Sequence, residues 1–123
     1  MNIEINGEVL KVKLCENSSA KALKQRLRQG ALTIDMKDYA HMEKFGSLGM
    51  RFPRNDEYIT TEPGDVILSE GNLLVIYYAP NTWNFTRLGK VQNMSAEQLK
   101  TVLGKGDVTA TVSISQEEME DEK

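Results

Sequence analysis

The spacing of apolar residues divides this chain into short strands. In residues 3–5 and again in residues 10–14, apolar side chains alternate with polar ones, and Asn6-Gly7 lies between the two segments. A period of two is typical of half-buried strands. Asn-Gly readily supplies the two positive φ angles that a tight hairpin turn needs. We therefore expect the chain to open with an antiparallel hairpin.

Further apolar runs predict more strands. Residues 73–78 form a continuous apolar run, which is typical of a strand covered on both faces. Tight turns at Pro63-Gly64 and Glu70-Gly71-Asn72 set off this run and the one before it. Together with the hairpin, we count about eight short strands, the later ones at Leu32–Met36, Val66–Leu68, Leu73–Tyr78, Thr86–Val91 and residues 108–114.

Two segments show helical periodicity instead. The first has apolar residues at positions 20, 23 and 27, with Asn17 or Ser18 as its cap and Gly30 just past its end. The second begins with the capping box formed by Ser95 and Gln98 and ends at Gly104. Two helices over the openings of a set of short strands favour a mainly β fold, a closed barrel without exposed edges.

The basic side chains of the first helix have two interpretations. Lys21, Lys24 and Arg28 line one side of it. The simpler interpretation is a solvated face whose later charges suit the helix dipole. The alternative is an anion-binding stripe.

Most of the candidate binding residues lie in one long segment. Residues 37–63 are mixed and punctuated by glycine, and they predict a long loop, which in a compact domain is often functional. This loop gathers several polar and aromatic groups, and a later loop contains Trp83. Individually, His41 also fits a surface histidine, Glu43 a solvated pair with Lys44, and Tyr39 a core aromatic. The predicted ligand-binding residues are Tyr39, His41, Glu43, Arg51 and Trp83.

Chain length and charge limit the number of domains and the classes of binding partner. A chain of 123 residues predicts one domain, which we place at residues 1–115. Residues 116–123 carry five acidic residues against Lys123, so of the total charge of −3 they hold −4 and the body holds +1. We expect this acidic tail to be disordered, and a nearly neutral body argues against nucleic-acid binding.

Other features argue against metals, cofactors and membranes. The chain has one histidine and one cysteine, Cys15, so we expect no metal site, no cofactor and no internal disulfide. No apolar run approaches the length of a membrane span, and the first residues alternate instead of forming a leader. A single cysteine fits a reducing compartment, so we expect a cytoplasmic protein.

Several motifs in order resemble the cyclophilin fold. "PGDVILS" (Pro63–Ser69) is similar to the cyclophilin run of Pro-Gly followed by an apolar strand, and "RLGKV" (Arg87–Val91) is similar to its Phe-Gly-Lys-Val strand. The likeness is closer to the small bacterial-type cyclophilin-like proteins, and it covers residues 1–115. It rests on Asp38-Tyr39-Ala40, Glu43-Lys44, Gly64-Asp65-Val66, Gly71-Asn72-Leu73 and Leu88-Gly89-Lys90-Val91.

The resemblance to cyclophilins raises prolyl isomerisation as an activity, but most of the cyclophilin pocket residues have no match in this sequence. The cyclophilin arginine belongs to a strand that matches Leu32–Met36, which contains no arginine. The pocket glutamine and phenylalanine would fall at Leu73 and Val75, and the pocket histidine has no counterpart. Trp83 falls at the spacing of the pocket tryptophan, and Arg51 or Arg54 would have to act as a displaced arginine.

Three hypotheses follow. The first is a binding module without chemistry, which holds a small molecule or peptide in a barrel-side cleft lined by the long loop and Trp83. The second is a peptidyl-prolyl isomerase with a rearranged site. The third is an interaction protein that works through its acidic tail or an exposed sheet. The ligand and the oligomeric state stay open.

Overall fold

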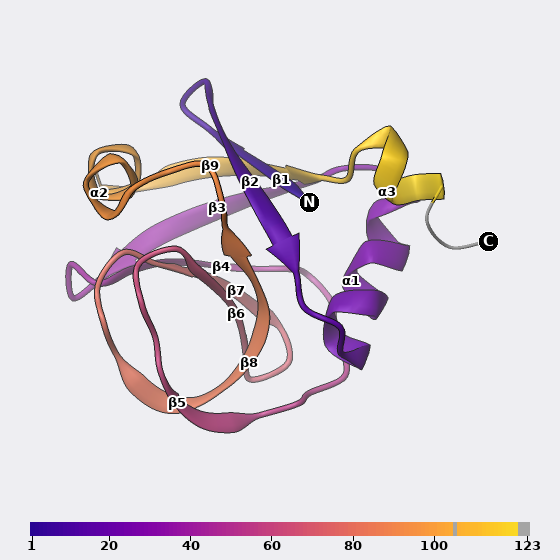
Figure 1. The fold of residues 1–123 in the computed structure, drawn as a ribbon, viewed down its shortest axis with the longest axis horizontal. Coiled ribbons are helices and arrows are strands. Elements are labelled where there is room, and N and C mark those ends of the chain that lie inside the picture. Colours follow the sequence, from indigo (N-terminus) through magenta and orange to yellow (C-terminus); the bar gives the residue numbers. More distant parts are fainter. Residues whose placement is uncertain (105, 121–123) are drawn as a thin grey trace.

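The computed structural model describes residues 1–104 and 106–120, in which nine strands and three helices follow one another (Figure 1). The elements are β1 (Asn2–Ile5), β2 (Glu8–Leu14), α1 (Ser18–Leu27), β3 (Leu32–Tyr39), β4 (Glu43–Ser47), β5 (Glu57–Thr60), β6 (Asp65–Ser69), β7 (Leu73–Tyr77), β8 (Thr82–Val91), α2 (Ala96–Leu103), β9 (Val108–Ser113) and α3 (Gln116–Glu120).

Eight antiparallel strands close into a barrel, which confirms the predicted fold class. The strands are hydrogen-bonded in the order β2, β1, β9, β3, β4, β7, β6, β8, and the ring closes because β8 also pairs with β2. At this closure Val12 pairs with Val91 and Leu14 pairs with Gly89. The remaining strand, β5, pairs only with the outer part of β8, where Ile59 lies opposite Trp83. Closure therefore leaves β5 as the strand outside the ring.

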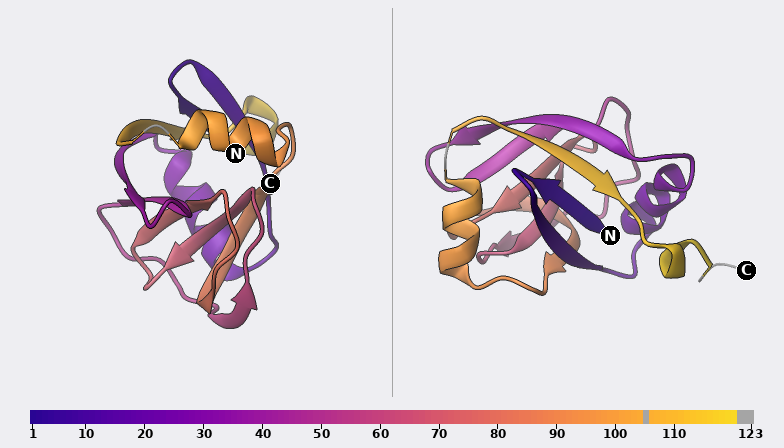
Figure 2. Two further views of the ribbon diagram at one scale, coloured as in Figure 1. Left: turned by 90° about the vertical axis from the view of Figure 1, so that its left-hand side faces the viewer. Right: turned by 90° about the horizontal axis from the view of Figure 1, so that it is seen from above.

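Helices lie at the two ends of the barrel. Figure 2 shows α2 across one end, while α1 and α3 lie at the other. Both predicted caps are present: the Asn17 side chain accepts from the backbone N–H of Ala20, and Ser95 and Gln98 form a reciprocal capping box. Each helix then turns an apolar face inward, so that Leu23 and Leu27 of α1 and Leu99 of α2 are buried in the core.

The apolar side chains form two clusters on opposite sides of the sheet. The larger fills the barrel. The smaller covers the outer face of β6, β7 and β8, where Ile67, Val75, Tyr77 and Phe85 are buried beneath β5. Burial on both faces explains the uninterrupted apolar run of β7.

The predicted long loop was wrong in part, because residues 37–63 contain the end of β3 and two further strands, β4 and β5. Gly46 is required in β4, since a Cβ atom at this position would lie 2.5 Å from the backbone oxygen of Asp35. A glycine in a strand often marks such a close approach between two backbones. Trp83 also differs from expectation, since it lies in β8 and not in a loop.

The acidic tail also departs from the predicted disorder. Its first part, Gln116–Glu120, forms the short helix α3. Ser115 and Glu118 make a capping box, with each backbone N–H donating to the other side chain at 3.1–3.2 Å. Glu118 also accepts a hydrogen bond from the Met1 ammonium group. Residues 121–123 of the predicted tail lie outside the described residues.

Candidate functional site

Two of the five predicted ligand-binding residues lie side by side. Tyr39 at the end of β3 is the register partner of Glu43 at the start of β4, and Glu43 is in turn the partner of Tyr77 on β7. Side chains directly opposite in an antiparallel pair are close enough to interact. Tyr39 is 57% exposed and contacts Phe45 edge to face, with the ring centroids 6.4 Å apart.

Glu43 is a buried carboxyl group on the outer face of the barrel, only 8% exposed. Burial raises its pKa, a hydrogen bond with Tyr77 opposes the shift, and the nearby charge of Asp38 adds to it. The Tyr77 hydroxyl also accepts a hydrogen bond from the Asn81 side chain at 3.2 Å. Glu43 is thus neither the solvated partner of Lys44 nor a residue of a flexible loop.

His41 lies in the tight turn between β3 and β4. Ala40 and His41 both have φ of +53°, and the N–H of Met42 donates to the carbonyl of Tyr39 at 3.0 Å. Two positive φ angles are the signature of a type I′ hairpin turn, which normally takes Asn-Gly. The His41 backbone donates to the Asp38 carboxylate at 3.1 Å, while its side chain is 95% exposed.

Behind this turn lies a polar cluster that the sequence did not reveal. The Lys44 side chain is fully buried, and its Nζ lies 2.9 Å from the Asp38 carboxylate. The Tyr78 hydroxyl donates to the same carboxylate oxygen. Burial acts to raise the pKa of Asp38, but the hydrogen bonds from Tyr78 and Lys44 outweigh it and leave the pKa lowered. Burial and this carboxylate raise the pKa of Tyr78.

The other predicted residues do not join this group. The Arg51 guanidinium donates to the carbonyl of Glu70 at 3.1 Å, in the turn between β6 and β7. This turn lies near the last residue of β4, whereas Glu43 is the first residue of that strand. Trp83 is 63% exposed on β8. It is two residues from Phe85, so both side chains lie on the same face of the strand. Arg54, the alternative displaced arginine, pairs with Asp56.

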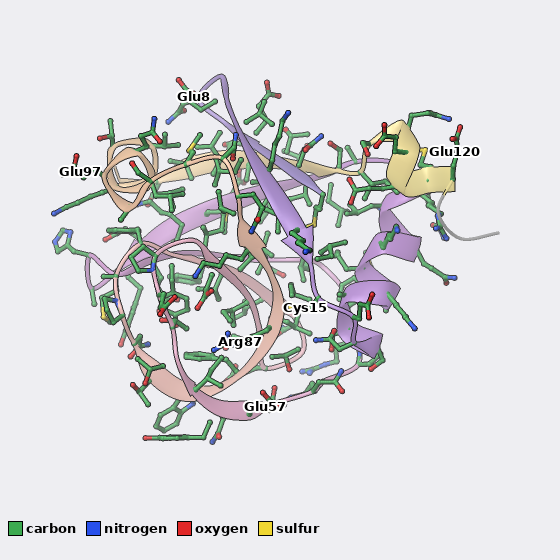
Figure 3. All side chains as sticks on the ribbon, viewed as in Figure 1. Glu8, Cys15, Glu57, Arg87, Glu97 and Glu120 are labelled. Carbon is green, nitrogen blue, oxygen red and sulfur yellow. The ribbon has the colours of Figure 1, made fainter. Side chains whose placement is uncertain are left out.

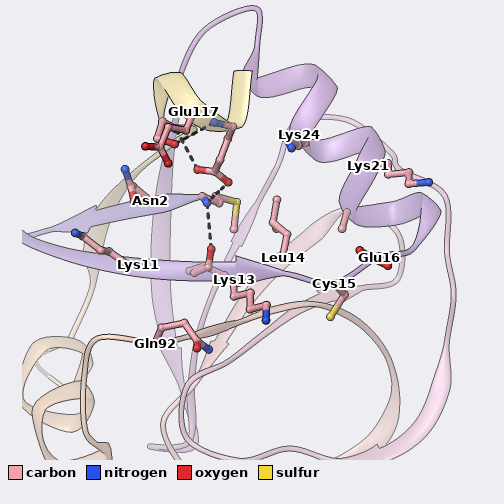
Figure 4. Close-up of a pocket in the computed structure, with 15 residues that line it drawn as sticks. Asn2, Lys11, Lys13, Leu14, Cys15, Glu16, Lys21, Lys24, Gln92 and Glu117 are labelled. Atoms are coloured by element: carbon pink, nitrogen blue, oxygen red, sulfur yellow. Dashed lines mark hydrogen bonds and ion pairs between the residues drawn. The ribbon is translucent and has the colours of Figure 1, made fainter. Parts of the chain in front are cut away.

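A large hollow lies elsewhere, between β2, α1 and α3 (Figure 4). It has a volume of about 910 Å³, and none of the five predicted residues lines it. Val12, Leu14 and Ala20 supply apolar surface. The polar lining consists of Asn2, Gln92, Ser115, Lys11, Lys13, Lys21, Lys24, Glu16, Glu117 and Glu118. We call this hollow the β2–α1 groove.

Cys15 gives the β2–α1 groove a thiol group. It follows β2 and lies beside α1, as Figures 3 and 4 show, and its N–H donates to the carbonyl of Leu88 at 2.8 Å. Partial burial raises the pKa of Cys15, and the positive charge of Arg87 opposes the shift. A thiol with a raised pKa is a poor nucleophile at neutral pH. Cys15 is therefore better suited to line a site than to carry out chemistry.

A second hollow of about 480 Å³ lies between the β1–β2 turn and α2. Its lining includes the carboxylates of Glu8 and Glu97 and the apolar side chains of Val9 and Val102, with no basic residue. Within residues 1–104 and 106–120, no three His, Cys, Asp or Glu side chains gather as metal ligands would. None of the helices described has the length and apolar character that crossing a bilayer requires.

Comparison with known proteins agrees with this architecture. A search of curated proteins gives no match. The structure of McbB in complex with tryptophan is similar to this chain, with a TM-score of 0.67 and 15% sequence identity. The similarity covers 94% of this chain but only 44% of McbB, so this chain spans less than half the length of that protein. The model of the Cyclophilin-like family matches residues 3–115, and this chain therefore belongs to the cyclophilin-like family.

Proposed function

We propose that this protein is a binding module that holds a small molecule in the β2–α1 groove and has no prolyl isomerase activity. The observation that carries the proposal is the groove itself. Its volume of about 910 Å³ falls in the range of roughly 300–1,000 Å³ that is typical of small-molecule sites. It combines the apolar side chains of Val12, Leu14 and Ala20 with charged groups from β2, α1 and α3.

The fold is compatible with such a ligand. McbB, which shares this fold, was solved in complex with tryptophan, so small organic molecules are a sensible first class to test. The arrangement gives less support to the isomerase alternative. Arg51 and Arg54 are both engaged, by the Glu70 carbonyl and by Asp56. Val75, at the position expected for the pocket phenylalanine, is buried in the outer cluster.

The chain contains one cysteine and one tryptophan, which report on different faces. Cys15 lines the groove, so a bound ligand should slow its alkylation by iodoacetamide, a neutral reagent. Trp83 lies on β8 away from the groove lining, so its fluorescence should stay unchanged when the groove is filled. We expect a library of small molecules to yield compounds that protect Cys15 without altering Trp83. Failure of every compound to protect Cys15 would contradict the proposal.

Peptide binding at the outer aromatic face is a second candidate. Tyr39 and Trp83 are mostly exposed beside the cluster that contains Phe85, and exposed aromatic side chains are frequent at binding surfaces. Glu43 would supply a buried carboxyl group next to Tyr39. In this case an added peptide would change Trp83 fluorescence and leave the alkylation of Cys15 unchanged.

A proline-containing peptide separates binding from catalysis. Two-dimensional NMR exchange measures the rate of cis/trans interconversion, whose uncatalysed barrier is about 18–20 kcal/mol. We expect the same exchange rate with and without the protein. An accelerated rate that is lost in Arg51→Ala or Arg54→Ala would establish the isomerase instead.

A further inference from the structure

In the β2–α1 groove, the lysine side chains lack partners within residues 1–104 and 106–120, whereas one of the glutamate side chains is already paired. Lysine side chains from two elements line it. Lys11 and Lys13 are two residues apart on β2, and Lys21 and Lys24 are three residues apart on α1. None of these four ammonium groups has a hydrogen-bond or ion-pair partner among the described residues. Residues three apart in a helix lie on the same side of it, so the α1 pair presents its charges together.

The carboxylates of the groove only partly offset these lysines. Glu118 already accepts from the Met1 ammonium group and from the N–H of Ser115. Glu16 and Glu117 remain, against the four lysines. The excess positive charge is notable because the chain as a whole carries −3. A local positive field in a hollow attracts anions and raises their local concentration.

The apolar surface of the groove limits what kind of anion would fit. Leu14, which is half-buried, lines the hollow (Figure 4), and the almost fully buried Val12 and Ala20 lie in its wall. Inorganic ions would leave the exposed part of Leu14 in contact with water, whereas an organic ligand would cover it. Burial of apolar area contributes about 25 cal/mol per Å².

We infer that the β2–α1 groove binds small organic anions, with the anionic group near Lys13, Lys21 and Lys24 and the apolar body against Leu14. This inference rests on the proposed function and adds the chemical class of the ligand. The second hollow provides an internal contrast, because Glu8 and Glu97 give it the opposite charge.

The test uses three probes with one chain length and different charge: hexanoate, hexylammonium and hexanol, with inorganic phosphate as a fourth. The readouts are the rate of Cys15 alkylation by iodoacetamide and the ¹H–¹⁵N shifts of Leu14 and Ala20. We expect hexanoate to protect Cys15 at least tenfold more strongly than hexylammonium, hexanol or phosphate. We also expect this protection to weaken as the salt concentration rises.

Matched variants assign the effect to the groove lysines. In Lys21→Gln with Lys24→Gln, the affinity for hexanoate should fall about fivefold to tenfold, as expected for the loss of two exposed charge pairs. The control, Lys37→Gln with Lys100→Gln, removes the same charge from exposed positions outside the groove and should bind like the wild type.

Each other outcome overturns a different statement. Equal protection by hexanoate and hexylammonium would leave a groove that binds small molecules but would refute the anionic class. Phosphate as effective as hexanoate would refute the role of the apolar surface, and an equal loss in both double variants would refute the assignment to Lys21 and Lys24. If neither these probes nor any library compound protects Cys15, the proposed function falls as well.

Discussion

The two ends of the barrel differ in that one has a buried, paired lysine side chain and the other has solvent-accessible lysine side chains that are unpaired within the described part of the chain. At the end covered by α2, the ammonium group of Lys44 is fully buried and bound to Asp38, which also accepts from Tyr78. At the end where α1 lies, Lys13, Lys21 and Lys24 line an open groove without partners among the described residues.

This difference suggests that the charge of Lys44 stabilises the fold, whereas the charges of the groove lysines are available to bind a ligand. A buried charge is tolerated only when it is paired and hydrogen-bonded, so the ammonium group of Lys44, bound to Asp38, is not free to bind a ligand. Unpaired charges in a solvated groove cost little, and they can exchange water for a ligand. Five predictions test this comparison, from the largest expected effect to the smallest.

The largest effect should come from Asp38→Asn, which leaves the buried ammonium group of Lys44 without its counter-charge. Breaking a buried ion pair costs about 3–5 kcal/mol, and we expect the lower end because Asp38 is partly exposed. Urea denaturation measures the loss. Adding Lys44→Met to the variant should restore most of the stability. A loss below about 0.5 kcal/mol would show that the pair does not hold this end together.

The same pair predicts a loss of stability in acid. The pKa of Asp38 is lower in the folded state than in the unfolded state, so the unfolded state takes up its proton first as the pH falls. The stabilisation from Asp38 is present above its ordinary pKa near 4 and is lost as the pH falls through the lowered folded value. The difference between wild type and Asp38→Asn should therefore shrink in acid.

Glu43 should show the opposite sign. Burial raises its folded pKa, so ionisation at neutral pH destabilises the protein, and its contribution to stability is lost as the pH rises through that value. Glu43→Gln should stabilise the protein by roughly 1 kcal/mol at pH 7, the scale of one buried hydrogen-bonding group. The gain should vanish near pH 4. A variant that is less stable than the wild type at pH 7 would contradict this interpretation.

The turn between β3 and β4 should respond more modestly. Replacing Ala40-His41 with Asn-Gly supplies residues that adopt φ of +53° more readily. We expect a gain of about 0.5–1 kcal/mol in thermal or urea denaturation. The same exchange would remove the exposed imidazole, so unchanged ligand binding by this variant would also exclude His41 from the site.

The groove lysines should contribute least to stability. The variant with Lys13→Gln, Lys21→Gln and Lys24→Gln should unfold within about 0.5 kcal/mol of the wild type, as is usual for exposed substitutions. The comparison would fail if this variant were as unstable as Asp38→Asn, because the lysines would then be structural as well.

Much of the fold could be predicted because its signals are local. Asn6-Gly7, the Asn17 cap and the Ser95 capping box each act over a few residues, and the structure confirms all three. The α3 helix carries the same kind of signal in Ser115 and Glu118, but the acidity of the segment obscured it.

β4 was missed because its signals are not local. Its sequence, Glu-Lys-Phe-Gly-Ser, has no apolar alternation. The Lys44 side chain points inward only because Asp38 and Tyr78 meet it there, and Gly46 is needed because β3 passes so close. Contacts between different strands decide both positions, and periodicity along one strand cannot reveal them.

The candidate site divides in the same way. Tyr39 and Glu43 were both singled out, but their pairing follows from a hairpin that the sequence did not show. The basic stripe with Lys21 and Lys24 was visible at helical spacing. That Lys13 and Cys15 lie across a groove from it depends on how α1 packs beside β2. No sequence pattern specifies that placement.

The position of β1 has a consequence for the order of folding. β1 lies between β2, its neighbour in sequence, and β9, which comes almost at the other end of the chain; Ile3 pairs with both Leu10 and Val112. During synthesis, one edge of β1 therefore stays unpaired until the last strand has left the ribosome. Pairings this distant in sequence slow folding, since a long loop must close before the contact forms. We expect the nascent barrel to be open, and exposed to wrong strand partners, until β9 has been synthesised.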